Sequence, residues 1–138
     1  EIVRATLATL DGLLRAKPTL TLGPLPKVAV DKEQVQKVLA NLILNASEAL
    51  GDAGEIHIST VRQGNHAVIS VADNGCGMSR DFLEQHLFRP FQTTKKKGMG
   101  IGLFHSKKLI EAHQGRIEVE SEEGQGSTFR VLLPIGQR

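Results

Sequence analysis

The sequence contains no tryptophan and no tyrosine, a single cysteine, and no apolar run longer than a few residues. Without Tyr or Trp the chain lacks the usual stacking platform for bases, and a formal net charge of +2 is too small to indicate nucleic acid. The lone Cys76 excludes an internal disulfide framework and fits a reducing compartment. Apolar stretches such as Val131-Leu132-Leu133 are too short to span a bilayer, and the first residues have no signal-peptide pattern. We therefore expect a cytoplasmic domain without a nucleic-acid partner.

The 138 residues, of which 40% are apolar and 23% charged, predict one globular domain with its own core. Helical spacing of apolar residues predicts helices over 2–16, from Asp31 to Leu50, and over 101–113. Alternating or β-branched segments predict strands over 19–22, 28–30, 56–61, 67–71, 116–121 and 128–134. Residues 79–84 are expected to form a helical turn and 85–99 a mobile loop. This order favours an α+β fold with helices on one face of a mixed sheet.

Asn41 and Asn45 lie four residues apart in the second predicted helix, so they share one face. Asn is a mediocre helix former because its side chain competes for backbone hydrogen bonds, so the pair needs an explanation. On spacing alone, a hydrogen-bonded polar seam is sufficient. The alternative is a polar pocket, since an amide oxygen suits Mg²⁺ that is also held by water and phosphates.

Two glycine-containing segments follow or join predicted strands. Asp73-Asn74-Gly75-Cys76-Gly77 comes directly after an apolar strand, and its carboxylate can accept a hydrogen bond from an amine such as that of adenine. Its glycines let the backbone approach a ligand closely, although an ordinary turn would also explain them. Gly124-Gln125-Gly126-Ser127-Thr128-Phe129 is explained by a tight hairpin, to which a binding role adds the hydroxyl of Thr128.

A third glycine cluster, Gly98-Met99-Gly100-Ile101-Gly102, opens the helix predicted over 101–113. Helix N-termini bind phosphates through free N–H groups and the positive end of the dipole. Residues 93–97, two threonines and three lysines, add hydroxyls and cations, although any single lysine is also explained by a solvated loop. The segment is neither a P-loop nor a convincing Rossmann motif, because the residues before it are polar and basic instead of a strand.

In this order, the segments together resemble the ATP-binding catalytic domain of sensor histidine kinases, within the gyrase/MutL/histidine-kinase ATPase superfamily. The resemblance covers about residues 27–134. The N box is Asn41-Leu42-Ile43-Leu44-Asn45-Ala46, and the G1 box is Asp73-Asn74-Gly75-Cys76-Gly77-Met78. The F box is Leu87-Phe88-Arg89-Pro90-Phe91, continued by Thr93-Thr94-Lys95, and the G2 box is Gly98-Met99-Gly100-Ile101-Gly102-Leu103. The last glycine box is Gly124-Gln125-Gly126-Ser127-Thr128-Phe129. The string Pro90-Phe91-Gln92-Thr93-Thr94-Lys95 looks most like the nitrogen-regulation type.

The resemblance implies a Bergerat-type ATPase fold, a two-layer α/β sandwich with a mixed, mainly antiparallel sheet of about five strands and three helices. It implies Mg-ATP as ligand, with Asn45 holding Mg²⁺ and Asn41 near the γ-phosphate. Asp73 would receive the adenine amine, with Thr128 completing a water-bridged contact. The cofactor-binding positions it implies are Asn45, Asp73, Gly75, Gly77, Met78, Phe88, Phe91, Thr94, Lys97, Gly98, Gly100, Ile101, Gly102, Leu103 and Thr128, and the catalytic ones are Asn41, Asn45 and Lys95.

Glu48 departs from this pattern, because many relatives carry there a basic residue that reaches a phosphate. A carboxylate repels phosphate, so Lys95 or Lys97 would have to supply the charge. An amide does not titrate in water, so Asn41 cannot act as a general base. Transfer of the phosphoryl group to an outside acceptor is therefore expected instead of efficient hydrolysis.

The acceptor is expected outside this chain, since none of the five histidines stands in a phosphoacceptor motif. The resemblance implies a dimerisation and phosphoacceptor domain of the same parent protein, a downstream response regulator, and a parent attached to a membrane. Residues 1–16 would be the tail of the connection to that domain. The alternatives are a serine kinase of the anti-sigma-factor type and a nucleotide-sensing interaction module without transfer activity. A Rossmann oxidoreductase is nearly excluded by the missing strand.

Overall fold

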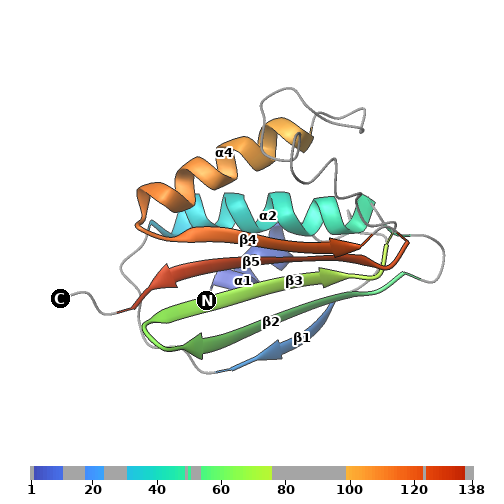
Figure 1. Ribbon diagram of the computed structural model, residues 1–138, viewed down its shortest axis with the longest axis horizontal. Helices are drawn as coiled ribbons and strands as arrows, with labels where there is room; N and C mark the ends of the chain where they lie inside the picture. Colours follow the sequence, from blue (N-terminus) through green and yellow to red (C-terminus); the bar gives the residue numbers. More distant parts are fainter. Residues whose placement is uncertain are drawn as a thin grey trace.

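The computed structural model describes residues 2–10, 18–23, 31–48, 50, 54–75, 99–122 and 124–135. Among these residues, three helices and a five-stranded sheet form two layers, with the helices on one side of the sheet (Figure 1). The elements along the chain are α1 (Ile2–Thr9), β1 (Thr19–Leu22), α2 (Lys32–Glu48), β2 (Ile56–Gln63), β3 (His66–Asp73), α4 (Met99–Ala112), β4 (Arg116–Glu122) and β5 (Gly126–Pro134). The predicted α+β fold is confirmed.

The sheet has the order β1-β2-β3-β5-β4. β1 is parallel to β2, and the other neighbours are antiparallel, so the sheet is mixed and mainly antiparallel as expected. The predicted hairpin of β2 and β3 turns at Gly64-Asn65, where Gly64 has a φ of 61°. This left-handed backbone favours glycine, because residues with a Cβ atom adopt a positive φ only at an energetic cost.

Helix α2 lies at the centre of the helical layer. The Asp31 carboxylate accepts hydrogen bonds from the backbone N–H groups of Glu33 (3.1 Å) and Gln34 (3.3 Å), which caps the helix start as predicted. The helix buries one apolar face at the spacing that the sequence predicted. This face packs on the inner side of the sheet in one core cluster, which includes Val35, Val38, Leu39, Leu42, Ile58, Val71, Phe129 and Val131.

The other two described helices flank α2. From the α1 segment, Val3 and the following Leu10 belong to the same core, so this segment packs onto the body of the domain. The expected role of residues 1–16 as a connection to another domain stays a prediction. Beyond α4, His113 donates from Nδ1 to the Leu109 carbonyl (2.8 Å) and accepts the Asp31 N–H at Nε2 (3.2 Å). This bridge ties the end of α4 to the start of α2.

Several element boundaries differ from the prediction. The last strand begins at Gly126 instead of residue 128, because Gly126, with a φ of 124°, is already part of the ladder to β4. α4 begins at Met99, inside the segment predicted as a loop over 85–99. Residues 11–17, 24–30 and 76–98 lie outside the described residues. They include the end of the helix predicted over 2–16, the strand predicted over 28–30, the helical turn predicted over 79–84 and the rest of the predicted loop, 85–98.

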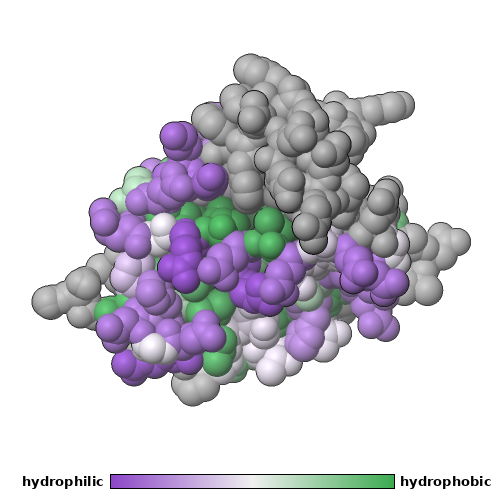
Figure 2. Space-filling view, viewed as in Figure 1, coloured by the Kyte–Doolittle hydropathy of each residue, from purple (hydrophilic) through white to green (hydrophobic). Residues whose placement is uncertain are grey.

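The outer face of the sheet carries mostly hydrophilic residues, as the viewed side of the molecule shows (Figure 2). Edge strand β4 contributes Glu118 and Glu120 to this face, where they form ion pairs with Arg116 (2.9 Å) and Arg130 (3.0 Å). Such exposed pairs contribute little to stability. None of the helices in the described ranges is long and apolar enough to cross a membrane.

Candidate functional site

Asn45 is a polar residue in the buried part of α2. Its side chain is 7% exposed, and its Oδ1 atom has no hydrogen-bond partner among the described residues. A buried carbonyl oxygen without a partner carries a desolvation cost of about 1–3 kcal/mol. Proteins seldom retain such an atom, so its presence indicates a ligand with a donor or a cation. An amide oxygen suits Mg²⁺, so this residue fits the ion that the sequence predicted.

Asn41, one turn earlier on the same helix face, is partly exposed and bonded to α4. Its Nδ2 donates a hydrogen bond of 3.2 Å to the hydroxyl oxygen of Ser106. Ser106 is 0% exposed and lies in the seam between the two helices. The amide nitrogen of Asn41 is therefore engaged by the protein. Asn41 therefore belongs to a hydrogen-bonded seam, the simpler of the two alternatives that the sequence left open, and the polar pocket at Asn45 stays a prediction.

Asp73 ends β3, as the sequence predicted. Its Oδ1 accepts a hydrogen bond of 2.8 Å from the backbone N–H of Gly75, which fixes the carboxylate at the turn. The next residue, Asn74, accepts the N–H of Glu55 at 2.7 Å and donates its own N–H to the Glu55 carbonyl at 3.3 Å. These bonds hold the chain that leaves β3 against the start of β2. Asp73 is therefore presented from a rigid strand end.

Gly126 of β5 lies against this turn. A Cβ atom on Gly126 would overlap the Asp73 carbonyl and lie 2.8 Å from the Cα of Asn74. Together with a φ of 124°, this contact requires glycine. The last glycine box therefore supports Asp73 through a close approach of two backbones.

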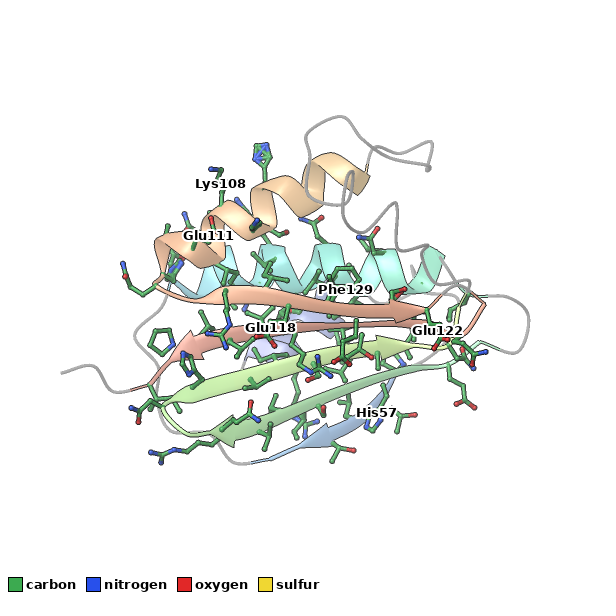
Figure 3. The ribbon with its side chains drawn as sticks, in the orientation of Figure 1. His57, Lys108, Glu111, Glu118, Glu122 and Phe129 are labelled. Atoms are coloured by element: carbon green, nitrogen blue, oxygen red, sulfur yellow. The ribbon has the colours of Figure 1, made fainter. Side chains whose placement is uncertain are left out.

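The pairing register corrects one predicted site residue. Ser127 lies directly opposite Asp73, and Thr128 lies opposite Ala72. Since side chains alternate along a strand, Thr128 stands on the other face of β5 from Phe129, which is in the core beneath the helices. Figure 3 labels Phe129 on β5. The expected contact of Thr128 on the Asp73 side is wrong, and the hydroxyl available there belongs to Ser127.

Ser127 is 7% exposed and is supported from the neighbouring strand. Its Oγ lies 2.7 Å from the Oγ of Ser121 on β4, and Ser121 also donates to the Gly126 carbonyl at 3.1 Å. The sequence contained a signal for Ser127, because the apolar residues Phe129, Val131 and Leu133 alternate along the strand and are buried. Counting back by two from Phe129 reaches Ser127.

The remaining predicted positions are described in part or not at all. Gly100, Ile101, Gly102 and Leu103 form the first turns of α4, where backbone N–H groups lack partners within a helix. Nothing is described of the Glu48 side chain. Gly77, Met78, Phe88, Phe91, Thr94, Lys95, Lys97 and Gly98 lie outside the described residues. The exposed Lys108 and Glu111 point away from the sheet (Figure 3).

The described site therefore has three parts on one side of the sheet. They are the amide pair of α2, the helix α4 that packs against α2, and the strand ends at Asp73 and Ser127. The arrangement offers an oxygen for a cation, backbone donors for an anion, and an acid for an amine. These are the features that the sequence predicted for binding a nucleoside triphosphate.

Comparisons with known proteins identify the family. The family described as histidine kinase-, DNA gyrase B-, and HSP90-like ATPase matches residues 30–137. The chain belongs to this family, and the resemblance drawn from the sequence is confirmed.

Among characterised relatives, sporulation kinase E of Bacillus subtilis is 42% identical over 114 residues, which are 82% of this chain and 15% of that protein. The sensor histidine kinase ZraS of Escherichia coli is 41% identical over 80% of this chain and 24% of its own length. The alginate biosynthesis sensor protein KinB of Pseudomonas aeruginosa is 41% identical over 88% of this chain and 21% of its own. This chain therefore spans a quarter or less of these relatives.

Solved structures support the same class. The catalytic domain of histidine kinase ThkA, in a nucleotide-free form, has a TM-score of 0.83 and 29% identity over 96% of this chain and 90% of that one. Full-length ShkA in complex with AMPPNP has a TM-score of 0.82 and 26% identity over 99% of this chain and 30% of that one.

Proposed function

We propose that this chain binds Mg-ATP and donates the γ-phosphoryl group to a histidine on a separate dimerisation domain of the same parent protein. The observation that carries this proposal is the buried Oδ1 of Asn45, which has no partner among the described residues. The parent would be a sensor kinase that signals to a response regulator, with this domain in the cytoplasm. ZraS, which is named as a sensor histidine kinase, and KinB, which is named as a sensor protein, support this assignment.

The adenine would be read at the strand ends. Asp73 already accepts one N–H from Gly75, and an ionised carboxylate has further acceptor sites for the exocyclic amine. Ser127, opposite Asp73, would supply the hydroxyl that the sequence assigned to Thr128. A carboxylate favours an amino group over a carbonyl, so we expect the site to select adenine over guanine or hypoxanthine.

The phosphates would lie toward α2 and the start of α4. Asn45 would hold Mg²⁺ through Oδ1, and the ion, when bound, neutralises charge on the phosphate oxygens. The backbone N–H groups at the start of α4 would receive the phosphates, with Lys95 and Lys97 adding positive charge as the resemblance implies. Asn41 would lie near the γ-phosphate without taking up a proton, since an amide is not a base.

The reaction needs an acceptor histidine with one unprotonated imidazole nitrogen. The lone pair of that nitrogen forms a bond to the γ-phosphorus, the bond from phosphorus to the bridging oxygen breaks, and ADP leaves with that electron pair. The histidines that the structure describes with hydrogen bonds fill local roles. His57 is bonded to Thr21 at 2.8 Å, and His113 bridges α4 and α2. This supports an acceptor on another domain.

Calorimetric titration of the chain with AMPPNP, with and without Mg²⁺, tests the first half of the proposal. We expect Mg²⁺ to increase the affinity for AMPPNP, and we expect the affinity for GTP to be lower. Adding a phosphoacceptor hairpin from the parent protein then tests transfer from radiolabelled ATP. Binding without transfer would favour the nucleotide-sensing module, transfer to serine would favour the anti-sigma-type kinase, and absence of binding would refute the proposal.

A further inference from the structure

Ser106 stands out as a fully buried hydroxyl in the middle of α4. It is 0% exposed and lies one turn before Ile110, which is also 0% exposed and belongs to the core. An apolar side chain would suit this face of the helix. In the described part of the chain, its hydroxyl oxygen accepts a hydrogen bond of 3.2 Å from the side chain of Asn41 on α2. The buried hydroxyl is therefore aimed at a residue of the proposed phosphate site.

The direction of this bond determines what Asn41 presents to a ligand. A side-chain amide has a donor NH₂ on one side and an acceptor oxygen on the other. Because the NH₂ group of Asn41 is bonded to Ser106, its Oδ1 lies on the opposite side of the amide, away from α4. One turn along the same face, Asn45 also offers an oxygen that has no partner among the described residues. The amide oxygen of Asn41 thus lies on the side away from α4, one turn from the unpartnered oxygen of Asn45.

Oxygens and N–H groups favour opposite ligands. A wall of carbonyl oxygens favours a cation or a water molecule held by one, whereas an N–H group pointing the same way would favour a phosphate oxygen and repel a cation. The hydrogen bond to Ser106 leaves the oxygen of the Asn41 amide, and not its NH₂ group, on the side away from α4. Without its hydroxyl, the amide of Asn41 would be free to turn over and present its NH₂ group.

We infer that Ser106 is a positioning residue, which fixes the amide of Asn41 so that its oxygen faces the nucleotide and the dependence of ATP binding on Mg²⁺ is set from α4. This inference rests on the proposed function. It also connects the helix whose first turn would receive the phosphates to the helix that would hold the metal.

A set of substitutions at position 106 separates the hydroxyl from the packing. Ser106→Thr keeps the hydroxyl, and Ser106→Val has nearly the same shape as Thr without it, so any overpacking is common to both. Ser106→Ala removes the hydroxyl without adding volume. Ser47→Ala is the matched control, since Ser47 is also buried (3% exposed) and lies on α2 outside the contact.

The readout is the ratio of AMPPNP affinities with and without Mg²⁺, measured by calorimetry. We expect Ser106→Ala and Ser106→Val to lower this ratio by about threefold to tenfold, the range for one lost positioning hydrogen bond. Ser106→Thr and Ser47→Ala should keep the wild-type ratio. In the double variant with Asn41→Ala, the Ser106→Ala change should have no further effect. A lower melting temperature with an unchanged ratio would overturn the inference, and so would additive effects of the two substitutions.

The side-chain NH₂ signals of Asn41 in a ¹⁵N–¹H spectrum give a second test that needs no nucleotide. Their assignment comes from the Asn41→Ala spectrum. Ser106→Ala should shift these signals strongly and those of Asn45 much less. If the wild-type chain binds no AMPPNP while these signals shift as expected, the hydrogen bond stands, and both the proposed function and the control of Mg²⁺ dependence fail. If AMPPNP binds and the signals do not move, the positioning role alone is refuted.

Discussion

The pairing of Asp73 with Ser127 makes a prediction that distinguishes two adjacent hydroxyls. Ser127→Ala removes the hydroxyl on the side of Asp73, whereas Thr128→Ala removes one on the other face of the sheet. If the Ser127 hydroxyl contributes one neutral hydrogen bond to the base, directly or through water, its loss costs about 1 kcal/mol, or about fivefold in affinity. Thr128→Ala touches no part of the site, so its affinity should stay within about twofold of wild type.

The structure also constrains the effect on folding. Ser127→Ala leaves Ser121 bonded to the Gly126 carbonyl at 3.1 Å, so no buried partner loses its only bond. The free energy of unfolding should therefore fall by about 1 kcal/mol or less. Thr128→Ala loses a β-branched residue in a strand, which also costs less than about 1 kcal/mol. Both proteins should fold, so their affinities can be compared directly.

Calorimetric titration with AMPPNP in the presence of Mg²⁺ measures the effect, and thermal unfolding confirms that both variants are folded. A role for Ser127 at the base is refuted if Thr128→Ala weakens binding and Ser127→Ala does not. That result would mean that the base lies on the outer face of the sheet, or that the side chains of β5 do not follow the ladder.

Three further predictions concern the same site. Asp73→Asn should lower AMPPNP affinity by about tenfold to a hundredfold, because it removes a charge-assisted bond and adds a donor facing the adenine amine; near-normal binding in the same titration would exclude the base-reading role. Asn45→Ala should reduce the Mg²⁺-dependent part of the affinity while binding in EDTA changes little, and equal losses under both conditions would contradict the metal assignment. Gly126→Ala should lower the free energy of unfolding in urea by about 2–4 kcal/mol, since the new Cβ meets backbone at a φ of 124°. An unchanged urea midpoint would show that the turn at Asp73 can move aside.

Local spacing predicted most of the fold. The positions of α2 followed from apolar residues that recur every three or four residues, and the β2–β3 hairpin followed from alternation around Gly64. Asp73 was placed at a strand end for the same reason. The order of the glycine and asparagine boxes along the 138 residues was also sufficient to predict the family.

The boundary and face of the last strand were harder to predict. The spacing of Gly124 and Gly126 is typical of a turn, which predicts a strand that starts at residue 128. In the structure Gly126 is in the ladder, because a second backbone at Asp73 leaves no room for a side chain there. A glycine in a turn and a glycine at a close approach look the same in a sequence. The period of two, counted from Phe129, was the better guide and selects Ser127.

The contact between Asn41 and Ser106 could not be predicted from the sequence for a different reason. Each residue is 65 positions from the other, and their meeting depends on how α2 and α4 are rotated about their axes. Helical spacing does place Ser106 on the buried face with Ile110, so the sequence indicates that its hydroxyl needs a partner. It does not say which of the polar residues on α2 or the sheet that partner is. A residue that binds a ligand leaves a local pattern in the sequence, whereas a residue that positions another leaves only an unexplained polar group. Such groups are therefore where a structure adds most to a family assignment.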